Sequence, residues 1–327
     1  MAGRIVVVGP INVDLFVRGS APTDPDVLRE WVDTCQVDLL AAGSVGYTCE
    51  ALSSLGAEIE LHTTLGTDAF GAGLRATLAE RGYDLTHVDE QAGDTGIGLY
   101  LLLFGGTKRP LVIRYPTVQP WPDPPAVDLS SEPPPRAVLA GGLLHFPEMY
   151  HRGLGALFAG ARARGVPTAL DPQFPLSPTD PPWLPHLDDV LPHTDVLCCD
   201  EGEAAAIFGT ADPAKAVAVA VGFGCRLVAI KRGAEGAIVG DGRVLVEQPA
   251  VPVPQSSVEE SVGAGDAFDA GLLTAFLDGA AVQDATRYAT ATAAVTLSGR
   301  GGSGTVRRDS VQRMLDLVPE PRMTVLS

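Results

Sequence analysis

Short runs of apolar, often β-branched residues alternate along the chain with alanine-rich segments. The apolar runs predict buried strands; they are RIVVVG (4–9), EIELHTTLG (58–66), PTALD (167–171), DVLCCD (195–200) and RLVAIKRG (226–233). The alanine-rich segments predict helices; they are 46–56, 70–82, 154–165, 201–209, 265–279 and 282–299. Alternation of this kind predicts a mostly parallel sheet that is covered by helices on both faces.

One region departs from this alternation. Residues 95–116, TGIGLYLLLFGGTKRPLVIRYP, hold two β-rich runs around a glycine turn, which predicts a hairpin. Together with NVDLFVRG (12–19), the hairpin is expected to form a small separate sheet that lies as a flap over the main body. Two proline-rich segments, 116–136 and 171–185, are expected to be surface loops.

Length and charge narrow the choice of partners. The chain has 327 residues, enough for one large domain or two modest ones, and a formal net charge of −17. We expect no nucleic-acid or anionic-membrane partner, because both need basic surface. The sequence shows no signal-peptide core, and no run approaches the roughly 18 apolar residues of a membrane span. Five cysteines without regular spacing fit reduced thiols, so we expect a cytoplasmic protein.

The segment ESVGAGDAFDAG (260–271) places three glycines around the start of a predicted helix. A glycine-rich turn there points several backbone N–H groups the same way, and with the helix dipole they form an anion site. Asp266 would repel an anion, but beside a phosphoryl group it can take the proton of an attacking hydroxyl. The segment therefore suggests phosphoryl transfer. A loop-to-helix junction with Asp266 as a favourable early-helix acid explains this segment alone equally well.

Several other catalytic motifs are missing from the sequence. The chain contains no GxxxxGK[ST], no HExxH and no GxGxxG after the first predicted strand. These absences argue against a P-loop nucleotidase, a metalloprotease of that type and a dinucleotide-binding protein.

Six segments, in the same order, resemble the ribokinase-like, PfkB-type carbohydrate kinases. They are 9–17, 41–56, 65–82, 198–209, 228–239 and 262–273, and the last, VGAGDAFDAGLL, is the most specific. The resemblance spans nearly the whole chain. It implies a three-layer α/β/α ribokinase-like fold, with a mostly parallel central sheet and a small β-sheet lid, as a single kinase domain over 1–327. The lid is expected to comprise approximately 11–20, 35–43 and 95–117.

The resemblance assigns the chemistry to the glycine-rich turn. It implies that Asp266 is the catalytic base and that the backbone of Gly263, Ala264 and Gly265, with the Asp266 amide, forms the anion hole for the γ-phosphate. It also implies ATP and Mg²⁺ as cofactors.

The same resemblance assigns residues to the acceptor. Asn12 and Asp14 match the family's ligands for substrate hydroxyls, although Asp14 can also be read as a turn residue after the first strand. Gly43 and Ser44 correspond to backbone that approaches the sugar. Tyr47 stands where the family usually has Asn, and it is either a substrate contact or a core-facing helix residue. This departure argues against ribose itself and favours an aromatic or bulkier acceptor.

At the nucleotide end, Asp200 and Glu203 match the family's Asn and Glu, which organise magnesium, with Glu203 acting through water. The alternative is a helix N-terminus with acids in its first turn. Lys231, Gly233 and Gly236 match the family's nucleotide-contacting turn. Lys231 either reaches a phosphate or is a solvated lysine at a strand end.

Two further sites are assigned by resemblance alone. Thr290 takes the position that often carries Asn or His beside the adenine. Glu260, with Thr296 and Gly301, occupies the positions of a monovalent-cation site. Because the family has Asp in place of Glu260, potassium binding is left open.

The motifs and the resemblance together predict an ATP- and magnesium-dependent kinase. It is expected to phosphorylate a hydroxyl of a sugar or sugar-like molecule, nucleosides included. We expect a homodimer that forms through the β lid. One alternative is a non-catalytic sugar or nucleotide sensor with the same fold. Another is a hydroxymethyl-pyrimidine or pyridoxal-type kinase, a group that generally lacks the β flap.

Overall fold

The chain folds around two β-sheets. The computed structural model describes residues 3–20, 24–103, 111–253, 261–297 and 306–326. The strands of the larger sheet follow the order β14-β13-β12-β11-β10-β9-β8-β1-β4-β5. Their bounds are β1 Arg4–Val8, β4 Glu58–Gly66, β5 Val88–Gln91, β8 Ala137–Gly141, β9 Thr168–Asp171, β10 Val196–Asp200, β11 Leu227–Lys231, β12 Ala237–Gly240, β13 Val244–Gln248 and β14 Arg322–Val325.

Most of this sheet is parallel, as the alternating pattern predicts. All neighbours from β5 through β11 pair in parallel. The edge formed by β11, β12, β13 and β14 is antiparallel. Strand β12 follows β11 after only a short turn at Gly233–Glu235, too short for the crossover that parallel strands need.

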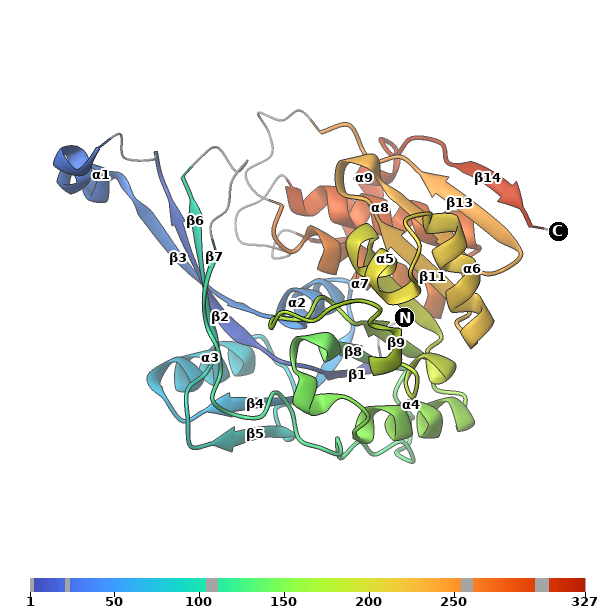
Figure 1. Cartoon of the computed structure of the whole chain (residues 1–327), viewed down its shortest axis with the longest axis horizontal. Helices are drawn as coiled ribbons and strands as arrows, with labels where there is room; N and C mark the ends of the chain where they lie inside the picture. The colour runs from blue at the N-terminus through green and yellow to red at the C-terminus, as the bar shows by residue number, and fades with distance from the viewer. Residues whose placement is uncertain (1–2, 21–23, 104–110, 254–260, 298–305, 327) are drawn as a thin grey trace.

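Helices cover both faces of the larger sheet (Figure 1). The α-helices are α1 Leu28–Thr34, α2 Gly46–Ser54, α3 Ala69–Glu80, α4 Gly153–Ala163, α5 Glu201–Phe208, α6 Pro213–Phe223, α7 Ala264–Leu277, α8 Val282–Leu297 and α9 Arg308–Leu315. The 3-10 helices are Pro25–Val27, Leu143–His145, Pro147–Met149, Leu184–His186, Leu191–His193 and Gly233–Glu235. No single described helix is long and apolar enough to cross a membrane. Helices α5 and α6 meet that test only together, with a 56° bend between them.

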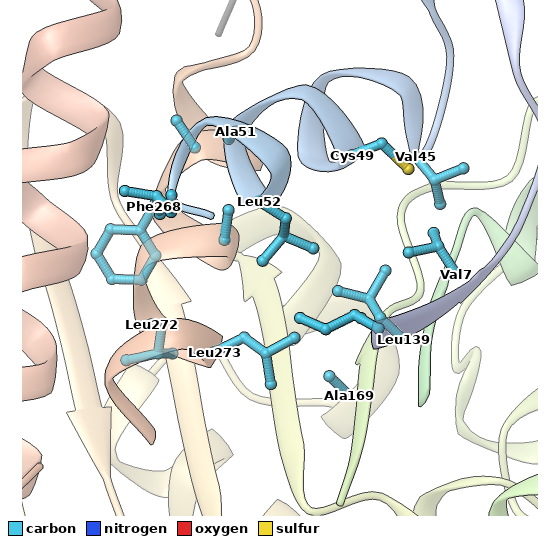
Figure 2. Close-up of a cluster of buried hydrophobic side chains, with 14 of the residues drawn as sticks. Val7, Val45, Cys49, Ala51, Leu52, Leu139, Ala169, Phe268, Leu272 and Leu273 are labelled. Atoms are coloured by element: carbon cyan, nitrogen blue, oxygen red, sulfur yellow. The ribbon is translucent and has the colours of Figure 1, made fainter. Parts of the chain in front are cut away.

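Alternate residues of β1 enter opposite halves of the core. Val7 belongs to the half that is covered by α2, α7 and α8, whereas Val6 and Val8 face α4, α5 and α6. Figure 2 shows Leu52 of α2 and Leu273 of α7 beside strand residues of the first half. The predicted three-layer α/β/α arrangement is therefore confirmed. Helix α2 also packs directly against α7, which brings segments far apart in sequence to one place.

The second sheet is small and projects from the body (Figure 1). Its strand order is β3-β2-β6-β7, with bounds β2 Asn12–Arg18, β3 Gln36–Ala42, β6 Ile97–Leu102 and β7 Leu111–Arg114. Strands β6 and β7 are antiparallel, as the hairpin prediction requires, and the predicted glycine turn between them lies outside the described residues. Strand β2 pairs in parallel with β6, which places Asp14 opposite Gly98.

The proline-rich segment 116–136 is not purely a surface loop. It contains no described helix or strand, as expected. However, Trp121 is only 2% exposed and packs in the half of the core that is covered by α4. Burial removes the large apolar ring of Trp121 from water, which stabilises the fold. A loop held entirely at the surface would leave that ring exposed.

Candidate active site

A cleft of about 480 Å³ lies between the small sheet and the carboxyl ends of three strands of the larger sheet. Strands β9, β10 and β11 end at Asp171, Asp200 and Lys231, and all three residues line the cleft. Ends of neighbouring parallel strands are where ligands bind in open α/β sheets. Asp14 of β2 and Asp266 of α7 line the same cleft.

The glycine-rich turn forms the start of α7. Gly263 precedes the helix with a φ of 81°, a left-handed conformation that glycine adopts without strain. Gly265 and Asp266 line the cleft, so the first-turn backbone faces it. The amide of Ala264 donates to the carbonyl of Ser261 at 3.3 Å. The first turn of α7 thus presents Gly265 and Asp266 most directly to a ligand.

The carboxyl group of Asp266 is held and tuned by its surroundings. Its Oδ1 accepts a hydrogen bond of 2.9 Å from the hydroxyl of Thr48, a residue of α2. Burial, with the nearby charge of Asp171, raises the pKa of Asp266 to about 6, while Lys231 and Thr48 act in the opposite direction. A carboxylate with this pKa is ionised at neutral pH and is still basic enough to accept a proton.

The end of the cleft where the sequence predicts the acceptor is organised around Asp14, which is 3% exposed. Its Oδ1 accepts 2.7 Å from Asn12 Nδ2, and its Oδ2 accepts 2.8 Å from the Tyr47 hydroxyl. Burial, followed by the charge of Asp14, raises the pKa of Tyr47 far above its usual value, so the phenol keeps its proton and donates. A Cβ at Gly98 would lie 2.5 Å from Asp14 Oδ1, which explains glycine opposite this acid.

Gly43 and Ser44 also line the cleft, close to Asn12. Gly43 has a φ of 92°, and a Cβ there would lie 2.5 Å from Asn12 Oδ1. The carbonyl of Ser44 accepts from the Gln173 side chain at 3.2 Å. Only glycine therefore lets this backbone approach the Asn12 amide so closely.

A compact charge cluster lies beneath the start of α7. Lys231 Nζ is 3.1 Å from Asp171 Oδ2 and 2.8 Å from Asp269 Oδ2. Burial alone would lower the pKa of Lys231, but Asp171 and Asp269 together raise it well above its ordinary value. A Cβ at Gly265 would lie 3.7 Å from Nζ, so the ammonium lies near the predicted anion hole. Lys231 is thus not a solvated strand-end lysine.

Asp200 and Glu203 form a reciprocal capping box at the start of α5. Each side chain accepts from the backbone amide of the other residue at 2.8 Å. Both residues also line the cleft. Burial, with the charge of Asp171, raises the pKa of Glu203 to about 8. Asp200 and Glu203 therefore cap the N-terminus of α5, as the alternative interpretation predicted, and they also face the cleft.

The other residues assigned to the nucleotide or to a cation differ in whether they line the cleft. Gly233 lines the cleft, and the chain at Gly236 approaches the backbone of Gln248 too closely for any Cβ. Thr290 is buried in α8, does not line the described cleft, and its Oγ1 has no partner among the described residues. Glu260 lies outside the described residues.

The partners of Asp266 and Lys231 were not predicted; they are Thr48, Asp171 and Asp269. Asp171 ends a predicted strand, and the rule that ligands bind at the carboxyl ends of parallel strands could have identified it. Asp269 lies one helical turn after Asp266, a spacing that places both on one face. Nothing in the sequence indicates that Thr48 meets Asp266, because that contact depends on how α2 packs against α7.

Comparison with known proteins identifies relatives along nearly the whole chain. The family model described as pfkB family carbohydrate kinase matches residues 4–308. A 2-dehydro-3-deoxygalactonokinase of Haloferax volcanii is 27% identical over 301 residues, which cover 88% of this chain and 91% of that protein. An ATP-dependent ribose-1-phosphate kinase of Halopiger xanaduensis is also 27% identical, over 95% of this chain and 98% of that protein.

Solved structures agree on the fold. The ribokinase of Arabidopsis thaliana, in complex with ribose and ATP, has a TM-score of 0.73 at 23% identity and covers 96% of this chain and 99% of its own. A ribokinase of Thermotoga maritima has a TM-score of 0.71 at 17% identity, over 96% and 99% of the two chains.

Together the fold and the family match define a ribokinase-like phosphotransferase with an alcohol group as acceptor. The chain belongs to the PfkB family of carbohydrate kinases, as predicted from its motifs. This membership favours a kinase over a non-catalytic sensor. Strands β6 and β7 of the small sheet, which line the cleft through Tyr100 and Leu111, argue against the pyridoxal-type alternative.

Proposed function

We propose that this chain transfers the γ-phosphate of ATP to a hydroxyl of a sugar or sugar-like acceptor, with Asp266 as the base. The observation that carries the proposal is that Asp14 and Asp266 line one cleft at the start of α7. Asp14 supplies a buried acceptor for substrate hydroxyls, and α7 supplies first-turn amides for a phosphoryl group. The names of the relatives above, all kinases of sugars or sugar derivatives, support this assignment.

The chemistry follows from these positions. Asp14, with Asn12, holds hydroxyls of the acceptor and directs another hydroxyl toward Asp266. Asp266 removes the proton of that hydroxyl while its oxygen forms a bond to the γ-phosphorus, and the bond between the γ-phosphorus and the β–γ bridging oxygen breaks. ADP leaves with that oxygen. Within the predicted anion hole at residues 263–266, the amides of Gly265 and Asp266 above all stabilise the charge on the transferring group.

Thr48 and Lys231 support the base and the anion hole. The Thr48 hydroxyl orients the Asp266 carboxylate by a hydrogen bond and favours its ionised form. Lys231, held by Asp171 and Asp269, keeps a positive charge near Gly265. We propose that the nucleotide lies along Gly233 and Gly236, with its adenine toward Thr290.

The nucleotide end suits a hard divalent cation. Asp171, Asp200 and Glu203 bring carboxylate oxygens to one side of the cleft. Burial and the charge of Asp171 raise the pKa of Glu203, and a nearby cation would favour its ionised form. We propose that Asp200 and Glu203, the latter through water, hold Mg²⁺, which when bound neutralises phosphate charge. A potassium site at Glu260 stays a prediction.

The small sheet is proposed to act as a lid and as a dimer contact. It lines the acceptor end of the cleft, so its closure would exclude water from the reaction. Val37 and Leu39 of β3 and Val112 of β7 are each more than half exposed. Exposed apolar residues on an outer sheet favour pairing with a second copy, which light scattering would detect. The free cysteines favour a cytoplasmic location.

A coupled ADP-release assay tests the proposed function. Wild-type protein with ATP and Mg²⁺ is screened against neutral sugars, ribonucleosides, sugar acids and sugar phosphates. We expect acceptor-dependent ADP release from wild type, and none above background from Asp266→Asn. ADP release that does not depend on any acceptor, or that survives this substitution, would contradict the proposal.

A further inference from the structure

The cationic side chains that line the described part of the cleft are already balanced by acids. Its lysine and arginine residues are Lys231 and Arg114. Arg114 Nη2 lies 2.7 Å from Asp68 Oδ2, and Lys231 Nζ is held between Asp171 and Asp269. Neither cation therefore offers uncompensated positive charge to an anionic group on the acceptor.

His145 also lines the cleft, and its Nδ1 is hydrogen-bonded to the carbonyl of Phe174. A carbonyl oxygen only accepts, so Nδ1 is the donor and is not free to meet an anion. Burial lowers the pKa of this histidine, which disfavours its charged form.

Acids outnumber cations along the described cleft. Asp14, Asp171, Asp200, Glu203 and Asp266 all line it. Those at the nucleotide end suit a metal ion, but Asp14 stands at the acceptor end, nearly fully buried. A carboxylate or phosphate on the acceptor would meet like charge there in a poorly solvated place, which disfavours binding.

The wall of the acceptor end is instead apolar and aromatic. It is built by the small sheet and by segments that follow β8 and β9; its large members are Ile97, Tyr100, Leu111, Ile113, Phe146, Phe174 and Leu176. The Tyr100 ring stacks on Phe16 with centroids 4.8 Å apart, so its position is supported from behind. Phe174 and Leu111 are 51% and 40% exposed although they line a cleft. Apolar surface left uncovered at a cleft fits a ligand that covers it.

We propose that the acceptor is an electrically neutral polyol that carries a flat ring able to stack on apolar side chains, as a ribonucleoside does, and that sugar acids and sugar phosphates are poor acceptors. Asp14 accepts hydrogen bonds from the hydroxyl groups of the acceptor, and the wall that includes Tyr100 and Phe174 covers the flat group of the acceptor. This inference rests on the proposed function but goes beyond it. It separates the chain from relatives whose names specify a sugar acid or a sugar phosphate.

Steady-state kinetics with four acceptors test the inference. They are ribose, uridine, 2-dehydro-3-deoxygluconate and ribose 1-phosphate, each measured with saturating ATP and Mg²⁺. We expect kcat/KM for uridine to exceed that for ribose at least tenfold, and both anions to fall at least tenfold below ribose. A value for either anion that equals or exceeds the value for uridine would overturn the inference while leaving the kinase function intact.

If no acceptor is phosphorylated, it is the proposed function that fails. Thermal shift with the same four compounds then decides the inference, because a ligand that binds the native state raises its Tm. A rise with uridine alone supports the inference, and any other pattern overturns it.

Phe174→Ala tests the apolar wall separately. We expect kcat/KM for uridine to fall at least fivefold more than kcat/KM for ribose, because ribose has no flat group to lose contact. Val325→Ala, at a 76% exposed residue of β14 outside the cleft, is the matched control and should change neither value. An equal loss for both acceptors in Phe174→Ala would mean that the ring supports the loop, and would overturn its assigned role.

Discussion

The hydroxyl of Thr48 donates a hydrogen bond of 2.9 Å to Oδ1 of Asp266, across 218 positions of sequence. The contact exists because α2 packs against α7. Tyr47, the preceding residue of the same helical turn, donates to Asp14. The first turn of α2 therefore holds both acids that we assign to the reaction, the acceptor ligand and the base.

Removal of the Thr48 hydroxyl should impair the chemical step. In Thr48→Val the shape is nearly kept, but the hydrogen bond to the Asp266 carboxylate is lost. Such a bond to a charged group contributes about 1.5–3 kcal/mol, so kcat should fall roughly 10- to 100-fold, with little change in KM. Thr48→Ser keeps the hydroxyl and should retain most activity. Equal losses in both variants would show that Thr48 acts through packing.

Activity should depend on pH through Asp266. The base works only when it is deprotonated, and its pKa is raised to about 6. We therefore expect kcat/KM to be level above neutrality and to fall about tenfold per pH unit below about pH 6. Because Thr48 lowers this pKa, Thr48→Val should move the fall to higher pH. A profile that stays flat down to pH 4.5, in protein shown by circular dichroism to remain folded, would contradict the assignment.

Tyr47 should affect binding more than chemistry. Tyr47→Phe keeps the ring but removes the donor to Asp14, so the acceptor ligand is less firmly held. We expect kcat/KM to fall roughly tenfold, mainly through a higher KM. Tyr83→Phe is the matched control, since Tyr83 is also buried but does not line the cleft. A similar loss in both variants would remove Tyr47 from the acceptor site.

Lys231 should be needed for stability. Lys231→Met leaves Asp171 and Asp269 without their shared cation, and breaking a buried pair costs about 3–5 kcal/mol. Urea denaturation should show this loss, and Lys231→Met combined with Asp269→Asn should recover part of it. Lys215→Met, which removes an exposed lysine paired with Asp212, should change little. No difference between the two lysine variants would contradict the role of the cluster.

Local patterns in the sequence predict much of this molecule. Apolar runs and alanine-rich segments correspond to strands and helices because burial on a parallel sheet constrains both. Asp14 and Asp266 were assigned from family motifs, and the structure places them along one cleft. Thr48 could not be assigned from the sequence, since its contact with Asp266 depends on the packing of α2 on α7. The spacing of Asp269 from Asp266 indicates a shared helix face, but not its contact with Lys231 at the end of β11. The sequence did not decide whether Tyr47 faces the core or contacts the substrate. In the structure Tyr47 is buried and also lines the cleft.

The transfer of phosphoryl from ATP to uridine in a single turnover tests the central claim most directly. Asp266→Asn keeps the size of the side chain and removes the base, while Asp316→Asn, at an exposed acid that directly follows α9, is the control. We predict that Asp266→Asn transfers phosphoryl at least 1,000-fold more slowly, with unchanged Tm and unchanged acceptor binding, while Asp316→Asn matches wild type. Transfer by Asp266→Asn within tenfold of wild type would contradict the account.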